Sequence, residues 1–145
     1  MKYLNILFLS MMPVTELRGA IPIGIAMDLD PIGVFAASVI GSSLISIPLI
    51  LTFRHILSFI RGISFLKSFA QKIDNKIETS MKKLKSASVL GIILFVGIPL
   101  PTTGSWTASA IASILHMRIR DAFIGIVLGN MMAGVIVTAI SMHII

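Results

Sequence analysis

Two apolar stretches of the chain are each interrupted by a short polar motif that contains proline. The first motif is ELRGAIP at residues 16–22 and the second is PLPTTGSW at residues 99–106, in comparable places of the two halves. A bilayer tolerates non-helical backbone and ionisable side chains only where protein or a water-filled cavity surrounds them. Paired interruptions of this kind are typical of transport sites built from broken helices. The motifs therefore predict two broken membrane segments around one polar site.

The composition indicates an integral membrane protein. The mean hydropathy is +1.00 and 12% of the residues are charged, whereas soluble domains contain about 25% charged residues. Four apolar runs, at residues 4–27, 32–53, 89–115 and 122–145, are each close to the length of about 20 residues with which a helix crosses a bilayer. We therefore predict one all-α membrane domain over residues 1–145.

A basic segment separates the two halves. The formal net charge is +6, and eight of the twelve Lys and Arg residues lie in this segment. Its apolar residues recur at steps of three and four, which predicts an amphipathic helix along the cytoplasmic interface. The charges satisfy the positive-inside rule or, alternatively, bind anionic lipid headgroups. No nucleic-acid partner is expected, because the segment lacks the run of interleaved aromatic residues on which single strands stack. The basic residues are Arg54, Arg61, Lys67, Lys72, Lys76, Lys82, Lys83 and Lys85.

The two halves can be overlaid without a gap at an offset of 88 residues. The overlay pairs Asp28 with His116 and Ser42 with Asn130. Each half contains an interrupted apolar stretch, a brief polar break and an uninterrupted apolar helix, so we predict an internal duplication. The predicted first repeat, basic connector and second repeat are residues 1–53, 54–87 and 88–145.

Charges beside the polar breaks predict the orientation of the repeats. The first break contains Asp28 and Asp30, and the second contains Arg118 and Arg120. Four full spans would place both breaks outside, against the positive-inside rule. If each interrupted stretch is instead a re-entrant or broken helical hairpin, the two repeats are inverted and the arginines lie inside. Each repeat then consists of one hairpin followed by one transmembrane helix.

Glu16 and Arg18 are ionisable residues within an apolar run, where such groups pair with each other or line a wet cavity. Positions i and i+2 of a regular helix do not face each other, so a close pair requires a broken backbone, which Gly19 and Pro22 would provide. In a functional interpretation, Glu16 exchanges a proton or cation and Arg18 holds an anionic group. Alternatively, the two form a structural ion pair at a hairpin tip.

The second motif is uncharged. Pro99 and Pro101 disfavour helix, and Gly104 permits a turn with positive φ. Free amides at the start of the following helix, together with hydroxyl groups, would form a neutral anion site. Alternatively, the hydroxyls only satisfy carbonyls freed by the turn. Asn130 is polar at membrane depth, and a hydrogen bond between helices is its expected role. The candidate substrate-binding or ion-binding residues are Glu16, Arg18, Thr102, Thr103, Ser105 and Asn130.

The two motifs resemble the signatures of the small multidrug export proteins of bacteria and archaea, and the resemblance covers nearly the whole chain. The chain departs from that pattern at Ser42, where asparagine is expected, and at Thr102, where a small glycine is common. The architecture is also similar to that of the DedA-like membrane proteins. That similarity implies inverted repeats with re-entrant hairpins and a role in recycling phosphorylated lipid carriers.

These observations predict a multi-pass secondary transporter or lipid-carrier flippase of the cytoplasmic (inner) membrane, coupled to protons or cations. Its expected cargo is a small molecule, as in multidrug export, or a lipid phosphate. A chain of this length would need a homo-oligomer to enclose a pathway. The alternative is a membrane scaffold or assembly protein that acts through the basic connector and transports nothing. No nucleophile, base and orienting group occur together, so we do not expect an enzyme, and we expect neither a cofactor nor a metal.

Overall fold

The computed structural model describes residues 1–61 and 85–144, and its regular elements in these ranges are all α-helices, as predicted. The predicted amphipathic helix of the connector lies mostly at residues 62–84, outside the described residues. Helices continue into the predicted connector from both sides, so the boundary predicted at residue 53 does not end a helix. The helices are α1 (Lys2–Met11), α2 (Glu16–Ala26), α3 (Pro31–Leu44), α4 (Ser46–Arg61), α6 (Lys85–Gly97), α7 (Ser105–Ile114) and α8 (Ile119–Ile144).

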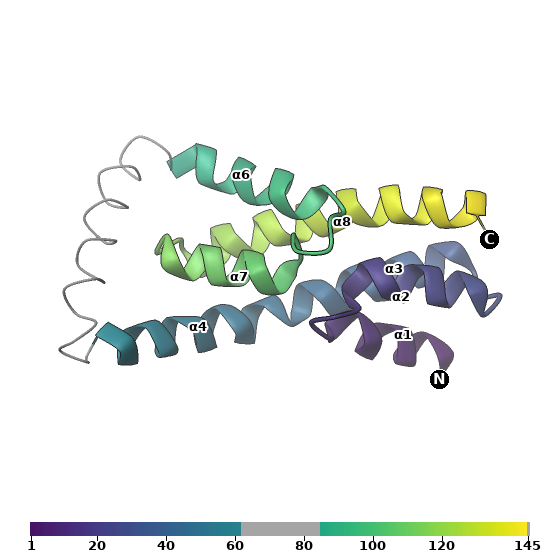
Figure 1. The fold of residues 1–145 in the computed structure, drawn as a ribbon, viewed down its shortest axis with the longest axis horizontal. Helices are drawn as coiled ribbons and strands as arrows, with labels where there is room; N and C mark the ends of the chain where they lie inside the picture. The colour runs from purple at the N-terminus through teal and green to yellow at the C-terminus, as the bar shows by residue number, and fades with distance from the viewer. Residues whose placement is uncertain (62–84, 145) are drawn as a thin grey trace.

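Two helical rods extend along the molecule (Figure 1). One consists of α3 and α4, which form an apolar run of 30 residues from Pro31 to Ile60, and the other is the 26-residue α8. A helix of 26 residues is about 39 Å long, which exceeds the hydrocarbon core of about 30 Å. Large apolar side chains on these rods are exposed, such as Ile32 at 77% and Phe59 at 75%. By length and composition, both rods can cross a membrane.

Proline residues explain where the first rod begins and where it is interrupted. Pro31 occupies the first turn of α3, where its missing amide has no cost, and Asp30 Oδ2 accepts a hydrogen bond of 2.9 Å from Gly33 N. Pro48 lacks the amide that would bond the carbonyl of Leu44, and α3 ends at that residue.

Two shorter hairpins pack against opposite ends of the rods (Figure 1). The hairpin of α1 and α2 lies beside α3 and the second half of α8. The hairpin of α6 and α7 lies beside α4 and the first half of α8, at the other end. Both links between paired helices, residues 12–15 and 98–104, lie in the middle of the molecule. The hairpin tips therefore meet each other.

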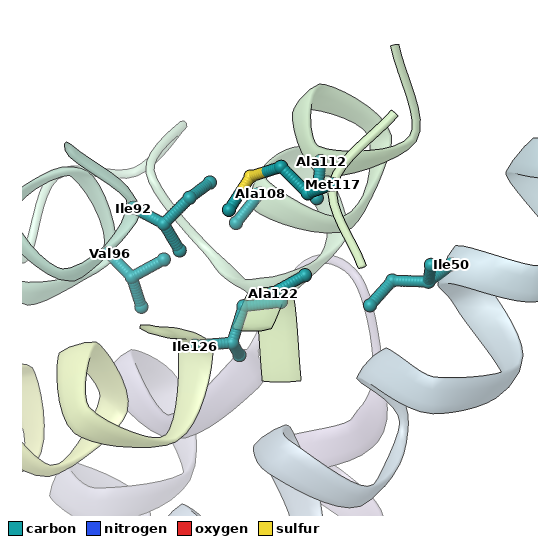
Figure 2. Close-up of a cluster of buried hydrophobic side chains, with 8 residues drawn as sticks. All are labelled: Ile50, Ile92, Val96, Ala108, Ala112, Met117, Ala122 and Ile126. Carbon is teal, nitrogen blue, oxygen red and sulfur yellow. The ribbon is translucent and has the colours of Figure 1, made fainter. Parts of the chain in front are cut away.

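Each hairpin has its own apolar core. In the core of the α6–α7 half, shown in Figure 2, side chains from α4, α6, α7 and α8 converge. The members of this core are Ile50, Ile92, Val96, Ala108, Ala112, Met117, Ala122 and Ile126. The core of the α1–α2 half contains Ile6, Leu17, Ala20, Ile21, Val34, Ala133 and Val137. Because α8 contributes to both cores, it fixes the two hairpins relative to each other.

The second helix of each hairpin ends in the same way. Asp28 after α2 and His116 after α7 have left-handed backbone, with φ of 56° and 53°. In both turns the left-handed residue donates its amide to the carbonyl three residues back, at 3.0 Å for Asp28 to Ile25 and 3.2 Å for His116 to Ser113. The next amide bonds five residues back, which completes a Schellman motif. The offset of 88 residues therefore pairs two positions of equal conformation.

Candidate functional site

The tip of the first hairpin is formed by residues 12–15. Pro13 restricts Met12 to extended backbone, with ψ of 143°, and α1 ends immediately before it. Thr15 Oγ1 donates a hydrogen bond of 2.6 Å to the carbonyl of Leu9 and so satisfies the end of α1. Glu16 then begins α2 with a left-handed φ of 45°.

The break predicted at Gly19 and Pro22 is wrong. Both residues lie inside α2, which continues to Ala26. Pro22 removes the amide that would bond the carbonyl of Arg18, but a membrane helix tolerates one such loss. The chain turns at Pro13 instead, three residues before the ELRGAIP motif begins. The backbone does depart from regular helix at the charge pair, as predicted. The departure is at Glu16, whose φ is positive, and not at Gly19 or Pro22.

The tip of the second hairpin is the non-helical link that contains Pro99 and Pro101. The hydroxyl of Thr103 organises it: Oγ1 donates to the carbonyl of Ile98 at 2.6 Å and accepts from the amide of Leu100 at 3.2 Å. Thr103 is buried, whereas Thr102 is exposed. Thr102 and Thr103 are predicted to have the same role, but in the structure only the hydroxyl of Thr103 lies inside the tip.

Glycine is required at position 104 because of a close approach by another side chain, and the predicted positive φ is absent. Its φ is −85° and its ψ is −177°, an extended conformation that any residue adopts. A Cβ atom at this position would lie 1.7 Å from Oε2 of Glu16 and 2.2 Å from its Cδ. The residue must therefore be glycine because the carboxylate of the other hairpin packs directly against its Cα.

Glu16 and Arg18 form a buried ion pair, with 3.0 Å between Oε2 and Nη1, and they link the two tips. Glu16 is 5% exposed, and its Oε1 accepts a hydrogen bond of 3.3 Å from the amide of Trp106, in the first turn of α7. Arg18 Nη2 donates to the carbonyl of Val96 at 2.8 Å, in the last turn of α6, and to the carbonyl of Thr103 at 2.9 Å, on the link before α7. Toward the second hairpin, Glu16 therefore lies at the start of α7, where the partial charge is positive, and Arg18 at the end of α6, where it is negative.

Trp106 makes a second connection between the tips. Its indole Nε1 donates a hydrogen bond of 3.2 Å to the carbonyl of Met11, the last residue of α1. This bond satisfies one of the carbonyls left without a partner where α1 ends. The only tryptophan of the chain therefore lies at the junction of the hairpins.

Asn130 lies behind this junction and is fully buried. Its Nδ2 donates to Ser43 Oγ at 3.1 Å and to Ser105 Oγ at 3.0 Å, which joins α8 to α3 and α7. Asn130 therefore forms hydrogen bonds between helices, as expected. Ser42, its counterpart in the overlay, instead donates to the carbonyl of Ser10 at 2.9 Å. The two halves therefore do not contain equivalent polar sites.

A cavity of about 300 Å³ adjoins the ion pair. Arg18 is its charged lining residue, and the Nε of Arg18 is buried without a hydrogen-bond acceptor. No sequence pattern identifies the α8 residues in this lining, because they are apolar or small. The lining residues are Arg18, Pro22, Pro99, Val137, Ile140, Ser141 and Ile144. Within residues 1–61 and 85–144, no group of three or more His, Asp or Glu side chains is placed to hold a metal ion.

The residues predicted to form the site therefore fall into two sets. Those gathered where the tips meet are Glu16, Arg18, Thr103, Ser105 and, through Ser105, Asn130. Thr102 remains exposed on the link. Sequence reasoning missed Val96 and Met11, because both act through backbone carbonyls, which any residue type supplies.

Comparison with known proteins places the chain in a family. Neither a curated protein nor a solved structure is significantly similar to the chain. A family model described as "Putative small multi-drug export protein" matches residues 16–136. The match begins at Glu16, immediately after the tip of the first hairpin, and includes the tip of the second hairpin and Asn130. The name of the family and the two long apolar helices together indicate a membrane protein. The chain belongs to the small multi-drug export protein family.

Proposed function

We propose that the protein is a small secondary transporter of the cytoplasmic membrane, and not an enzyme, with its translocation path through the junction of the two hairpin tips. One observation carries the proposal: a buried ion pair connects two hairpins in the middle of the molecule. Ionisable groups at membrane depth are expensive and are generally functional. Export of small molecules agrees with the description of the family.

Glu16 is the proposed coupling group. As a carboxylate, it holds Arg18 at 3.0 Å and the amide of Trp106 at 3.3 Å. Uptake of a proton removes its charge and weakens its attraction for Arg18, which loosens one hairpin from the other. A cation that binds the carboxylate in place of Arg18 would act in the same way. Cargo passage then requires the contact between the tips to open and close.

We further propose that the hairpins are re-entrant and that the two halves are inverted repeats. The offset of 88 residues pairs Asp28 with His116, which have the same left-handed backbone. It also pairs Gly41 with Gly129, where an added Cβ would lie 2.4 Å from the carbonyl oxygen of Leu7 and 3.1 Å from that of Ile93. In each half, glycine therefore admits the first helix of its own hairpin. A homo-oligomer would complete the pathway, because one copy supplies only two long rods in its described part.

Labelling of single cysteines tests this topology. Asp30 and Arg118 are matched positions, both exposed and each immediately before or at the start of a long helix. The chain contains no native cysteine. We expect Asp30→Cys in intact cells to react with an impermeant thiol reagent, and Arg118→Cys to react only after permeabilisation. Reaction of both in intact cells would replace the re-entrant arrangement with four full spans.

A transport assay with Glu16→Gln tests the function. The substitution keeps the size of the side chain and an oxygen for the amide of Trp106, but it cannot exchange a proton. In proteoliposomes with an imposed pH gradient, we expect the wild type to move ethidium and Glu16→Gln to lose at least about 90% of that rate, which is tenfold or 1.4 kcal/mol.

Asp30→Asn is the matched control, because this carboxylate is exposed and remote from the tips, and we expect its rate to be unchanged. A fluorescent phospholipid in the same vesicles tests the flippase form of the proposal. A Glu16→Gln rate equal to that of wild type would remove Glu16 from coupling. A wild type that moves neither probe would argue against transport.

A further inference from the structure

Two arginines from different elements line one cavity at the end of the molecule where α7 turns into α8. This cavity has a volume of about 310 Å³ and lies far from the hairpin tips, at the end where α4 finishes and α6 begins (Figure 1). Arg54 comes from α4 and Arg118 from the α7–α8 turn. The lining residues are Arg54, Leu57, Ser113, His116, Met117 and Arg118. We call this space the basic cavity.

The position of Arg54 is fixed by the core. Its Nη2 donates a hydrogen bond to the backbone carbonyl of Met117. The side chain of Met117 is buried in the same cluster as Ile50, one turn before Arg54 on α4 (Figure 2). A guanidinium has five N–H donors in a planar fork, and this contact with the backbone uses one of its nitrogens. Arg54 is therefore oriented in advance, with donors left for a ligand.

The charge of the basic cavity is not neutralised by the described part of the chain. In residues 1–61 and 85–144, the structure has an ion pair at Arg18 and Glu16, and neither Arg54 nor Arg118 pairs with a carboxylate there. Asp121, in the first turn of α8, does not line the cavity. Two guanidinium groups around one space repel each other unless an anion lies between them. The planar fork of arginine matches the oxygens of phosphate.

The surroundings of the basic cavity fit a lipid better than a dissolved ion. Leu57 lines the cavity together with Arg54. Ile56 and Phe59, which follow Arg54 and Leu57 by two residues and so lie on another side of α4, are 47% and 75% exposed. Apolar side chains of α4 therefore face the surroundings at the level of the cavity, and a phospholipid can place its phosphate between the arginines while its acyl chains pack beside this helix.

We propose that the basic cavity binds the phosphate of an anionic phospholipid. This site is separate from the hairpin junction and does not depend on the transport function. The bound lipid would hold the end of α4 to the α7–α8 turn, at the level of the headgroups.

Native mass spectrometry of the full-length protein in detergent tests the proposal with phosphatidylglycerol as the probe. We expect one tightly retained lipid in the wild type. Each arginine should contribute about tenfold in affinity, which corresponds to 1.4 kcal/mol, so Arg54→Gln with Arg118→Gln should weaken binding about 100-fold. Arg120→Gln is the matched control, because this exposed arginine does not line the cavity, and its binding should equal that of wild type.

Arg118→Gln alone keeps the test valid if the double variant does not fold, because Arg118 is exposed and a surface substitution there is well tolerated. We expect it to weaken binding about tenfold. Equal lipid binding by Arg118→Gln and Arg120→Gln would overturn the proposal. Displacement of phosphatidylglycerol by millimolar inorganic phosphate, with equal affinity for both, would overturn the lipid as the source of the phosphate.

Discussion

Gly104→Ala is expected to lower the free energy of unfolding by about 3 kcal/mol, the cost of separating a buried charge pair. The added Cβ would lie 1.7 Å from Oε2 of Glu16 and 2.2 Å from Oε1, so the carboxylate must leave its position. Glu16 then loses the amide of Trp106, and Arg18 loses its counter-charge. Unfolding of the purified protein in detergent, followed by the loss of its size-exclusion peak on heating or by titration with a denaturing detergent, measures the effect.

Gly91→Ala is the matched control. Gly91 also lies on the second hairpin, within α6, and an added Cβ there meets nothing within 4 Å. Alanine favours helix over glycine by up to about 1 kcal/mol, so this variant should be as stable as the wild type or more stable. Equal stability of Gly104→Ala and Gly91→Ala would contradict the close approach of Glu16.

A double-mutant cycle identifies the cause of the Gly104→Ala effect. In a Glu16→Ala background the carboxylate is absent, and the new methyl group has space. We therefore expect Gly104→Ala to cost much less in that background, and the difference is the coupling energy of the two positions. Additive effects would mean that the alanine acts on the turn itself.

Arg18→Leu is expected to destabilise the protein by about 3 kcal/mol and to loosen the tip of the second hairpin. The substitution leaves the carboxylate of Glu16 buried without its partner. It also removes the donors to the carbonyl of Val96, at the end of α6, and to that of Thr103, on the link. Hydrogen exchange measured by mass spectrometry should therefore increase in the peptide that covers residues 98–104.

Arg120→Leu is the control for Arg18→Leu, because it makes the same change at an exposed arginine far from the tips. We expect it to change neither stability nor exchange at residues 98–104. Glu16→Gln added to Arg18→Leu should recover part of the lost stability, since it removes the buried charge that has lost its partner. Unchanged exchange at residues 98–104 in Arg18→Leu would show that Arg18 does not hold this link.

These two predictions concern one bridge, and they change the interpretation of Arg18. Its Nη1 and Nη2 contact Glu16, Val96 and Thr103, so most of the guanidinium is engaged within the protein. Arg18 therefore serves first as a clamp between the hairpins, as in the structural interpretation of the pair. Its Nε is buried without a hydrogen-bond acceptor. In the proposed transport cycle, the clamp itself is what opens.

The residue pattern predicted the helical fold and the family, but local rules misplaced the break in the first hairpin. Gly19 and Pro22 look like helix breakers, yet α2 runs through both, and Pro13 marks the turn. Asp28 and His116 adopt left-handed backbone without being glycine. The hydrogen bonds of a Schellman motif offset the energetic cost of one non-glycine residue with left-handed backbone. Such motifs have no fixed sequence, so the pattern of residues does not reveal them.

The sequence by itself determined that the chain is apolar and helical, that the segment with Pro99 and Pro101 interrupts it, and that Glu16 and Arg18 require either a partner or a wet cavity. These properties follow from hydropathy, proline chemistry and the cost of charge in an apolar run, which are local. Only the tertiary structure decided what the pair holds. Its partners, Val96, Thr103 and Trp106, are 78 to 90 residues away along the chain and bond mainly through backbone groups. Every residue has those groups, so no pattern of side chains can identify them, and only the packing of both hairpins against α8 brings them together.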